Sequence, residues 1–353
     1  MESSNGNHSG NHSRDAKRQK TFPGLGFSEL PHDIRGMIAQ RTSVDDIINL
    51  VRSGAIPGTA NIDARQYHDN LIRQRDMWEH LVGGDNYYYT VLENALKIDN
   101  FTKLDLAWVK DPDGFGPLET ALSDPQTTVI TLFITKAHLN EEAAVAIANA
   151  LAKNKTLTTL DISENEICKA VSDGPYTANG VKALAEALEE NKVLRYLNLS
   201  QNQLCGIAAI GPIMSDDEYS DEGISALANA MKTNQSLMRL DISKNTITSK
   251  GAVALAPALL VNVALKELNL QGNLVEAEGA KAIGEALEKN RVLTALNLAN
   301  NQIRDQGAAA IAEALRGNRV LTSLDVRGNN ISSTGAAAIR DAVSGREGFE
   351  LKM

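Results

Sequence analysis

The feature that most constrains the fold is a pattern that repeats every 28 residues in the C-terminal part of the chain. The pattern L-x-x-L-x-I-x-x-N-x-I begins at Leu237, and it returns with small aliphatic exchanges at Leu265, Leu293 and Leu321. Self-similarity at a fixed period of this size is typical of solenoids, in which each unit packs only on its neighbours. The sequence therefore predicts an array of stacked units.

Earlier units follow the same pattern with larger departures. Units begin at Leu194, Leu157 and Val129, and a degenerate unit contains Phe101, Leu104 and Leu106. This spelling resembles the leucine-rich repeat. The resemblance implies an α/β horseshoe over residues 101–353, with parallel strands inside and helices outside. We expect Phe349 to Leu351 to form a short closing strand, because Phe349 lies 28 residues after Leu321.

Two columns of asparagine recur with the repeat, and we interpret both as structural. The first column, inside the motif, should bond backbone groups of the turns that lack a partner in the sheet. The second column precedes each strand, where Asn tolerates the left-handed conformation that ends many helices. The columns are Asn165, Asn202, Asn245, Asn273, Asn301 and Asn329, and Asn154, Asn191, Asn234, Asn262, Asn290 and Asn318.

The segments between the motifs are alanine-rich and predict helices that sit close to the strands. They are spelled GVKALAEAL, GISALANAM, GAVALAPAL, GAKAIGEAL, GAAAIAEAL and GAAAIRDAV. Pro257 interrupts the third of these. Proline inside a helix removes a hydrogen bond, so we expect a kinked or shortened helix there.

Composition excludes several classes of function. The net charge of −9 and pI of about 5.3 argue against a nucleic-acid partner, which would need a basic stripe. No apolar run approaches the length of a membrane span, and the N-terminus lacks the apolar core of a secretory signal peptide. Two cysteines indicate a reducing intracellular compartment.

Residues 1–21 are expected to be a disordered polar tail. They consist mostly of Ser, Asn, Gly and His and end in a basic cluster around Arg14 to Lys20. The cluster is either a nuclear-localisation signal or a solvated tail. The polar, Ser-rich start also resembles the starts of bacterial type III secreted effectors, which implies secretion into the cytoplasm of a host cell.

Residues 22–100 show helical apolar spacing and form a predicted N-terminal head. The segment Leu30-Pro31-His32-Asp33-Ile34, followed by Ile38 and Asp46-Ile47, resembles an F-box. That family docks on the Skp adaptor of a cullin–RING ubiquitin ligase, and the resemblance assigns adaptor contacts to Leu30, Pro31, Ile34, Ile38 and Ile47. The family usually continues with a Trp, and no Trp lies near this segment. The alternative is a helical cap that closes the apolar end of the solenoid.

The head, the polar start and the G-A-x-A-L-A helices together resemble the GALA family. Its members are F-box leucine-rich-repeat effectors of plant-pathogenic bacteria. The resemblance implies a substrate receptor whose repeats present an unknown target protein to a ubiquitin ligase.

The 28-residue spacing is broken twice. Leu157 and Leu194 are 37 residues apart, and Leu194 and Leu237 are 43 apart. The insertions, near residues 168–178 and 205–221, should leave the same edge of adjacent units. They are either a binding face, with Tyr176, Ile213, Met214 and Tyr219 as contact candidates, or neutral length variation. Cys168 and Cys205 begin them, and we interpret both as buried thiols.

Strand residues between the leucines should face the concave side. Phe133, Tyr196 and Arg239 depart from the Asp and Asn common there, and aromatic residues and Arg are typical interface anchors. We find no nucleophile–base set, phosphate loop or metal cluster, so the sequence predicts a non-enzymatic interaction protein without cofactor. Two alternatives to the ligase receptor remain, a plain repeat scaffold or inhibitor and a Ran GTPase-activating protein. The acidic tail typical of the latter is missing.

Overall fold

The computed structural model describes residues 103–105, 116–125, 127–169, 176–206 and 220–353. Within them the chain forms one parallel sheet of nine strands, ordered β1 to β9 along the chain. Each strand has three residues. The strands are β1 (Lys103–Asp105), β2 (Thr131–Phe133), β3 (Thr159–Asp161), β4 (Tyr196–Asn198), β5 (Arg239–Asp241), β6 (Glu267–Asn269), β7 (Ala295–Asn297), β8 (Ser323–Asp325) and β9 (Glu350–Lys352).

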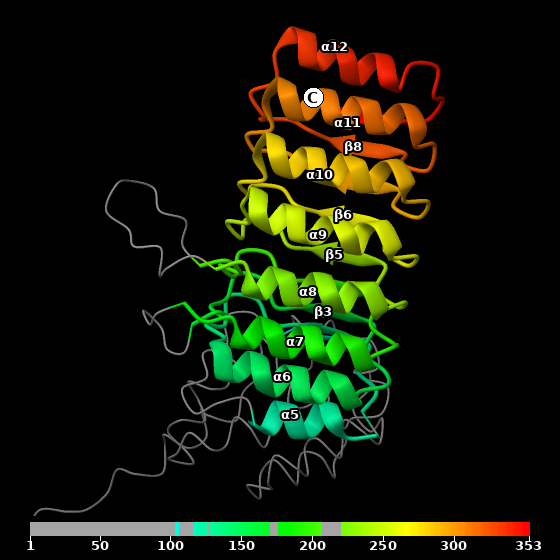
Figure 1. Ribbon diagram of the computed structural model, residues 1–353. Coiled ribbons are helices and arrows are strands. Elements are labelled where there is room, and N and C mark those ends of the chain that lie inside the picture. The colour runs from blue at the N-terminus through cyan, green and yellow to red at the C-terminus, as the bar shows by residue number, and fades with distance from the viewer. Residues whose placement is uncertain (1–102, 106–115, 126, 170–175, 207–219) are drawn as a thin grey trace, which may run out of the picture.

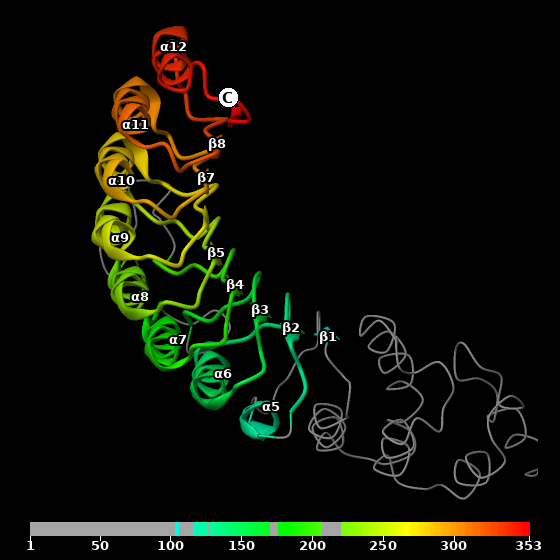
Figure 2. The same cartoon turned by 90° about the vertical axis from the view of Figure 1, so that its right-hand side faces the viewer.

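One helix follows each strand from the second to the eighth, and one precedes β2. The helices are α5 (Gly116–Ser123), α6 (Glu141–Lys153), α7 (Asn179–Glu190), α8 (Glu222–Thr233), α9 (Ser249–Val261), α10 (Glu276–Lys289), α11 (Arg304–Gly317) and α12 (Ser333–Ala342). They lie side by side in chain order (Figure 1). Figure 2 shows the helices on the outer side of an arc and the strands on its inner side. The predicted solenoid is confirmed.

The core lies between the sheet and the helices. The middle residue of each strand from β2 to β8 is a leucine with at most 2% of its surface exposed, and these leucines align in register, as Leu160, Leu197 and Leu240 do. Side chains alternate along a strand, so the residues on either side of each leucine face the concave surface. The expected closing strand is present as β9 and pairs with β8, but it begins and ends one residue later than the predicted Phe349 to Leu351.

The first asparagine column bonds backbone groups of the turns, as predicted, and these bonds also link successive units. The side-chain amide of Asn301 donates to the carbonyl of Leu270 in the preceding unit at 2.8 Å, and Asn329 donates to Leu298 in the same way. The side-chain oxygen of Asn329 accepts the backbone N–H of Asn301 at 2.7 Å. This chain of bonds supplies the partners that the short strands lack.

The second asparagine column ends the helices, but the expected left-handed conformation is wrong. Asn290 has φ −65° and ψ 137°, and the other members of the column are also extended. Their side chains explain their recurrence. The oxygen of Asn290 accepts the N–H groups of Val292 and Leu293, and its amide donates to the carbonyl of Leu259 at the end of the preceding helix. Left-handed residues lie instead in the loops after the strands.

Pro257 neither ends nor shortens its helix, contrary to expectation. α9 runs uninterrupted for 13 residues, the same length as α6 (Figure 1). Residues on both sides of the proline are buried, including Leu255 and Leu259. Packing of this face holds the helical backbone through the position where one hydrogen bond is missing.

Candidate protein-binding surface

Two rows of side chains cross the concave face, one on each side of the buried leucines. The strand register aligns the members of each row. The first row is Thr131, Thr159, Tyr196, Arg239, Glu267, Ala295, Ser323 and Glu350, and the second is Phe133, Asp161, Asn198, Asp241, Asn269, Asn297, Asp325 and Lys352. The second row is nearly uniform, whereas the first varies from strand to strand.

The Asp and Asn side chains of the second row cap the turns that follow their strands. In each of the six strands β3 to β8, the side-chain oxygen accepts the backbone N–H two residues further on, as Asp241 does from Ser243 at 2.9 Å. In two of these strands the side-chain amide also bonds along the row. Asn198 donates to Asp161 at 2.9 Å, and Asn269 donates to Asp241 at 2.7 Å. This row is therefore mainly structural.

Tyr196 and Arg239 are brought together by the register of β4 and β5, where they are directly paired. Arg239 Nε lies 2.9 Å from Glu267 Oε1 on β6, and the Arg239 side chain keeps 60% of its surface exposed. An aromatic ring, a guanidinium and a carboxylate thus follow one another across three strands. Of the sequence-predicted contact residues, this is the one pair among the described residues that the fold places side by side on the concave face.

The phenol of Tyr196 is held in its neutral form. Its pKa is raised to about 12, first by burial and then by the carboxylates of Asp161 and Asp241. Both carboxylates belong to the second row, on the strands that flank Tyr196. A neutral phenol can donate a hydrogen bond to a partner, and its ring offers apolar area beside a cation.

Phe133 lies in the second row at β2, paired with Asp161. It is half-buried and separated from Tyr196 by strand β3 and by the central leucines. The structure therefore does not join Phe133 to the Tyr196–Arg239 pair. Phe133 is therefore a separate contact candidate, at the N-terminal part of the concave face.

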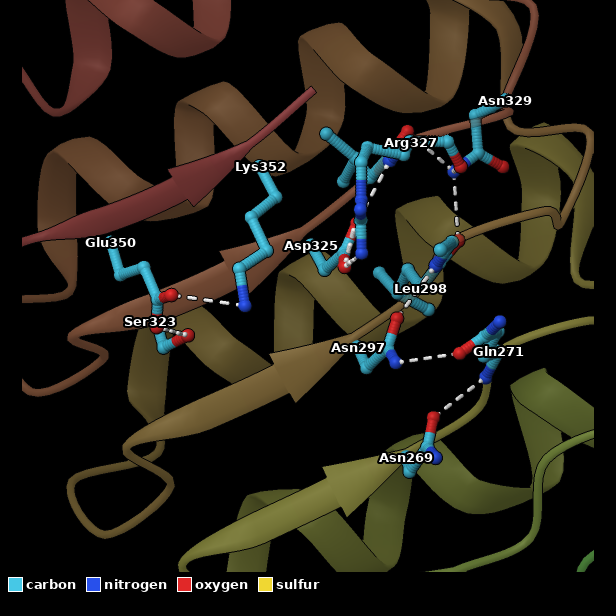
Figure 3. A network of polar contacts seen from close by, with 12 residues as sticks. Asn269, Gln271, Asn297, Leu298, Ser323, Asp325, Arg327, Asn329, Glu350 and Lys352 are labelled. Carbon is cyan, nitrogen blue, oxygen red and sulfur yellow. Dashed lines mark hydrogen bonds and ion pairs between the residues drawn. The ribbon is translucent and has the colours of Figure 1, made fainter.

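The C-terminal end of the concave face carries a connected polar network (Figure 3). Arg327 Nη2 donates to Asp325 Oδ2 at 2.6 Å, and Ser323 donates to Glu350, which also pairs with Lys352. Burial acts to raise the pKa of Asp325, but the side-chain and backbone hydrogen bonds from Arg327 outweigh it and lower the pKa. These charged side chains largely pair with one another within the protein, so they offer less charge to a binding partner.

A shallow hollow of about 340 Å³ lies along the loops that follow β2 to β4, and sequence reasoning missed it. Lys136 and His138 face Glu164 and Glu166 there at 3.4 and 3.6 Å. Gln201 and Gln203 complete much of the lining. Left-handed backbone at several of these positions recurs in later units, at Lys244, Thr246, Asn300 and Gln302, so it belongs to the repeat and could not have signalled a site.

One acceptor near this hollow stands out. Asn202 is fully buried, and its side-chain oxygen has no hydrogen-bond partner among the described residues. In other units the corresponding oxygen accepts a backbone N–H of the preceding motif, as that of Asn245 does from Asn202 at 2.7 Å. Between the units of β3 and β4, where the first insertion occurs, the asparagine ladder keeps the bond from the Asn202 amide to the carbonyl of Ile162 and lacks only the accepting bond.

The stems of the two insertions lie side by side. Lys169 bridges Tyr176 across the first stem, and Thr177 donates to the carbonyl of Cys168 at 2.7 Å. Ser220 donates to the carbonyl of Cys205 at 3.2 Å and closes the second stem. The Tyr176 side chain is partly buried against the core, so much of its surface packs within the protein at the stem. Ile213, Met214 and Tyr219 lie outside the described residues.

The two cysteines are free and fully buried. They occupy the same position in adjacent units, directly after the last motif residue. The interpretation as buried thiols is confirmed.

The candidate adaptor contacts Leu30, Pro31, Ile34, Ile38 and Ile47 lie outside the described residues. Within the part of the chain that the structure describes, no group of three or more His, Cys, Asp or Glu could hold a metal ion. The same residues include no helix that is both long enough and apolar enough to cross a bilayer.

Comparison with known families agrees with the repeat. The family profile described as "Leucine Rich repeat" matches residues 153–167, 233–256, 261–284, 289–312 and 317–339. Together with the sheet and helices above, these matches make the chain a leucine-rich-repeat protein. Solenoids of this kind present an extended concave binding surface, so the repeats indicate a protein-interaction module.

Solved structures resemble the chain only distantly, and no curated protein matches its sequence significantly. An internalin (inlF) from Listeria monocytogenes is 18% identical over 74% of this chain and 63% of its own, with a TM-score of 0.40. LegL7 from Legionella pneumophila is 15% identical over 68% of this chain and 79% of its own, with a TM-score of 0.38. The tropomodulin C-terminal domain from Caenorhabditis elegans is 15% identical over 46% of this chain and 90% of its own, with a TM-score of 0.38. None of these likenesses bears on the partner.

Proposed function

We propose that the chain is a target receptor of a ubiquitin ligase, with its concave face binding the target protein and its N-terminal segment docking on a Skp-type adaptor. The observation that carries target binding is the direct pairing of Tyr196 and Arg239 on β4 and β5. Tyr and Arg are the residues most often responsible for binding energy at protein interfaces.

The surroundings of this pair define the kind of segment it would bind. Asp161 and Asp241 act on the phenol of Tyr196, which is neutral, and Glu267 pairs with Arg239 beside it. Complementary charge favours a target segment that carries a basic side chain together with an apolar or aromatic one. The basic group would meet the carboxylates, and the apolar group would stack on the Tyr196 ring.

Adaptor docking is supported by the sequence pattern from Leu30 to Ile47 alone. An amphipathic helical segment that presents Leu30, Pro31 and Ile34 matches the groove-binding mode of peptide recognition. The likeness to GALA effectors leads us to propose also that the protein acts in the cytoplasm of a host cell, with the basic cluster at residues 14–20 offering entry to the nucleus.

A site-specific crosslinker tests the concave surface. A photoreactive residue replaces Thr159, which pairs with Tyr196 in the same row, in one variant and Glu313, on the outer face of α11, in another. We expect host proteins to be captured at position 159 and to be lost when Arg239→Ala is added. Equal capture at positions 159 and 313 would exclude the concave pair as the binding site.

Adaptor binding is tested separately with purified Skp protein. The full chain should retain the adaptor in a pull-down, and a Leu30→Ala, Pro31→Ala double variant should lose it while its thermal unfolding stays unchanged. If the wild-type chain retains no adaptor, the second candidate function applies: a leucine-rich-repeat scaffold or inhibitor with a helical cap. The crosslinking result would still stand in that case.

A further inference from the structure

The outer face of α9 is apolar where both neighbouring helices are polar. Val253, Pro257, Leu260 and Val261 are spaced by three or four residues or adjoin, so they lie on one face of the helix. Val263 follows directly after the helix. All five are exposed, and the exposed fraction is 42% for Val253, 43% for Leu260, 50% for Val261 and 65% for Val263.

The flanking helices show what the repeat normally carries at these positions. Each position can be counted from the asparagine that ends its helix, Asn234, Asn262 or Asn290. α8 and the residue beyond its end supply Ser225, Asn229, Lys232, Thr233 and Gln235, whereas α10 and its following turn supply Lys281, Glu285, Glu288, Lys289 and Arg291. An apolar residue thus replaces a polar one five times in a single unit.

This concentration is unusual for the described surface. Of the six large hydrophobic residues exposed there, four belong to α9 or its following turn. Scattered exposed apolar residues are common, but a contiguous apolar patch with a polar rim marks an interaction site. The patch faces away from the strands, because the helices line the outer side of the arc (Figure 2).

The charges on the rim indicate what covers the patch. A two-fold axis that lies in the interface plane and runs parallel to α9 brings the outer faces of two copies together, with α9 beside α9 and α8 of one copy opposite α10 of the other. Lys232 on α8 and Glu288 on α10 each stand two residues before the asparagine that ends their helix, so both are level with Leu260. The axis therefore brings Lys232 of one copy opposite Glu288 of the other, twice per pair of molecules.

The same operation brings Asn229 opposite Glu285, an amide donor opposite a carboxylate. Lys232 and Glu288 are both exposed. Lys232 contacts Asn229 at 2.8 Å, and among the described residues neither Lys232 nor Glu288 forms an ion pair. Both charges are thus available to a facing molecule. A self-complementary apolar stripe with opposite charges on its two sides is what an isologous interface requires.

We propose that the outer face of α9, centred on Pro257 and Leu260, is a homodimer interface in which a second copy of this chain packs α9 against α9. This interface is separate from the concave face, so a dimer presents two target-binding surfaces pointing away from each other. The proposal does not depend on the proposed function.

The first test transfers the outer residues of α10 onto α9. The five changes are Val253→Lys, Pro257→Glu, Leu260→Glu, Val261→Lys and Val263→Arg, and each new residue already occupies the matching position of the next unit. Sedimentation velocity of the full chain, from about 1 to about 300 µM, covers the range of weak dimers. We expect the wild type to reach twice the monomer mass and the grafted variant to remain monomeric, with a dissociation constant at least ~10-fold higher.

The second test uses the predicted cross-copy pair. Lys232→Glu and Glu288→Lys should each weaken dimerisation, because each places two like charges opposite each other in the homodimer. An equimolar mixture of the two variants should dimerise again, since both pairs are then of opposite charge. Arg340→Glu, on the distant α12, is the matched charge-reversal control and should dimerise like the wild type.

Three outcomes would overturn the proposal. A wild type that stays monomeric over the whole range has no such interface. A grafted variant that dimerises as strongly as the wild type places the interface elsewhere. A mixture of the two charge variants that dimerises no better than either alone excludes the two-fold arrangement. Unchanged circular dichroism of every variant ensures that these results report association and not unfolding.

Discussion

The hydroxyl of Tyr176 donates a hydrogen bond of 2.8 Å to the backbone carbonyl of Leu204, which belongs to the next repeat unit. A second, longer contact of 3.4 Å joins the same hydroxyl to the carbonyl of Ser220. Tyr176 closes the stem of the first insertion, and Leu204 and Ser220 flank the second. The two places where the repeat is broken are therefore tied together through one phenol.

Tyr176→Phe should loosen both stems without unfolding the solenoid. The change removes the donor but keeps the ring, so we expect a loss of about 0.5–1.5 kcal/mol in the free energy of unfolding. Hydrogen exchange gives the sharper measurement. The amides of Thr177 and Ser220, which donate to Cys168 and Cys205, should exchange faster, while amides of α10 to α12 keep their protection. An effect spread evenly over the solenoid would contradict this coupling.

Asn301 and Asn297 form a matched pair four residues apart. Asn301 is fully buried and donates to Leu270, Leu298 and Ala299, whereas Asn297 is half-buried and caps its own turn. Asn301→Ala leaves buried carbonyls without a donor and should cost about 2–4 kcal/mol. Asn297→Ala should cost about 1 kcal/mol. Urea unfolding of the two variants checks the order, and equal losses would show that the ladder does not stabilise the array.

Gly180 and Gly317 differ in the space that surrounds them. A Cβ on Gly180 would lie 2.2 Å from the carbonyl oxygen of Ile167 and 2.9 Å from Ala144 Cβ, whereas a Cβ on Gly317 would meet only the side chain of Glu288, at 3.3 Å. Gly180→Ala should therefore force the helix away from the strand layer and cost about 1–3 kcal/mol.

Gly317→Ala is the control for that change. The flexible Glu288 side chain can move, and alanine reduces the freedom of the unfolded chain, so the expected effect lies between none and a gain of about 1 kcal/mol. Thermal unfolding of both variants measures the difference. A Gly180→Ala variant as stable as the wild type would show that the distance between the helix and the strand layer leaves room for a Cβ at position 180.

The repeat could be predicted from the sequence because its period leaves few alternatives. The spacing of Leu237, Leu240 and Ile242 determines which side chains point inward, and recurrence at 28 residues determines which strands are neighbours. The register of Tyr196 with Arg239 follows from the same alignment, since each stands two positions after the first leucine of its motif. The pairing of Tyr196 with Arg239 could therefore be predicted from the sequence pattern alone.

Other features depend on contacts that no local pattern encodes. The extended backbone of the helix-ending asparagines arises because Asn290 reaches the carbonyl of Leu259 in the preceding unit. The role of Tyr176 depends on the stem of a different insertion. The apolar outer face of α9 is visible in the sequence once the units are aligned. Its exposure, however, is established only when the helices are placed on the outer side of the sheet.

Replacing Pro257 should stabilise the protein under dilute conditions. Pro257 lacks the N–H that would bond to the carbonyl of Val253, yet α9 remains helical around it. Pro257→Ala restores that donor, and we expect a gain of about 1–3 kcal/mol in the unfolding free energy, measured at protein concentrations low enough for a monomer. Glu285→Ala, at the equivalent exposed position of α10, is the control and should change stability by less than about 0.5 kcal/mol.

The thiol of Cys168 should react only when the chain opens. Burial raises its pKa from the ordinary value of 9.0 to about 12, and the carboxylate of Glu141 adds to the rise. Because the thiolate is the reactive form, a Cys205→Ala chain should react with a thiol reagent slowly at neutral pH and rapidly in denaturant.

The raised pKa of Cys168 also has a consequence for stability. Below pH 9.0 both states hold the proton, but between 9.0 and about 12 the unfolded state loses it first, so stability falls as the pH rises. Cys168→Ala should make that alkaline decline shallower. A Cys168 that reacts in the native state as fast as in denaturant would contradict its place in the core.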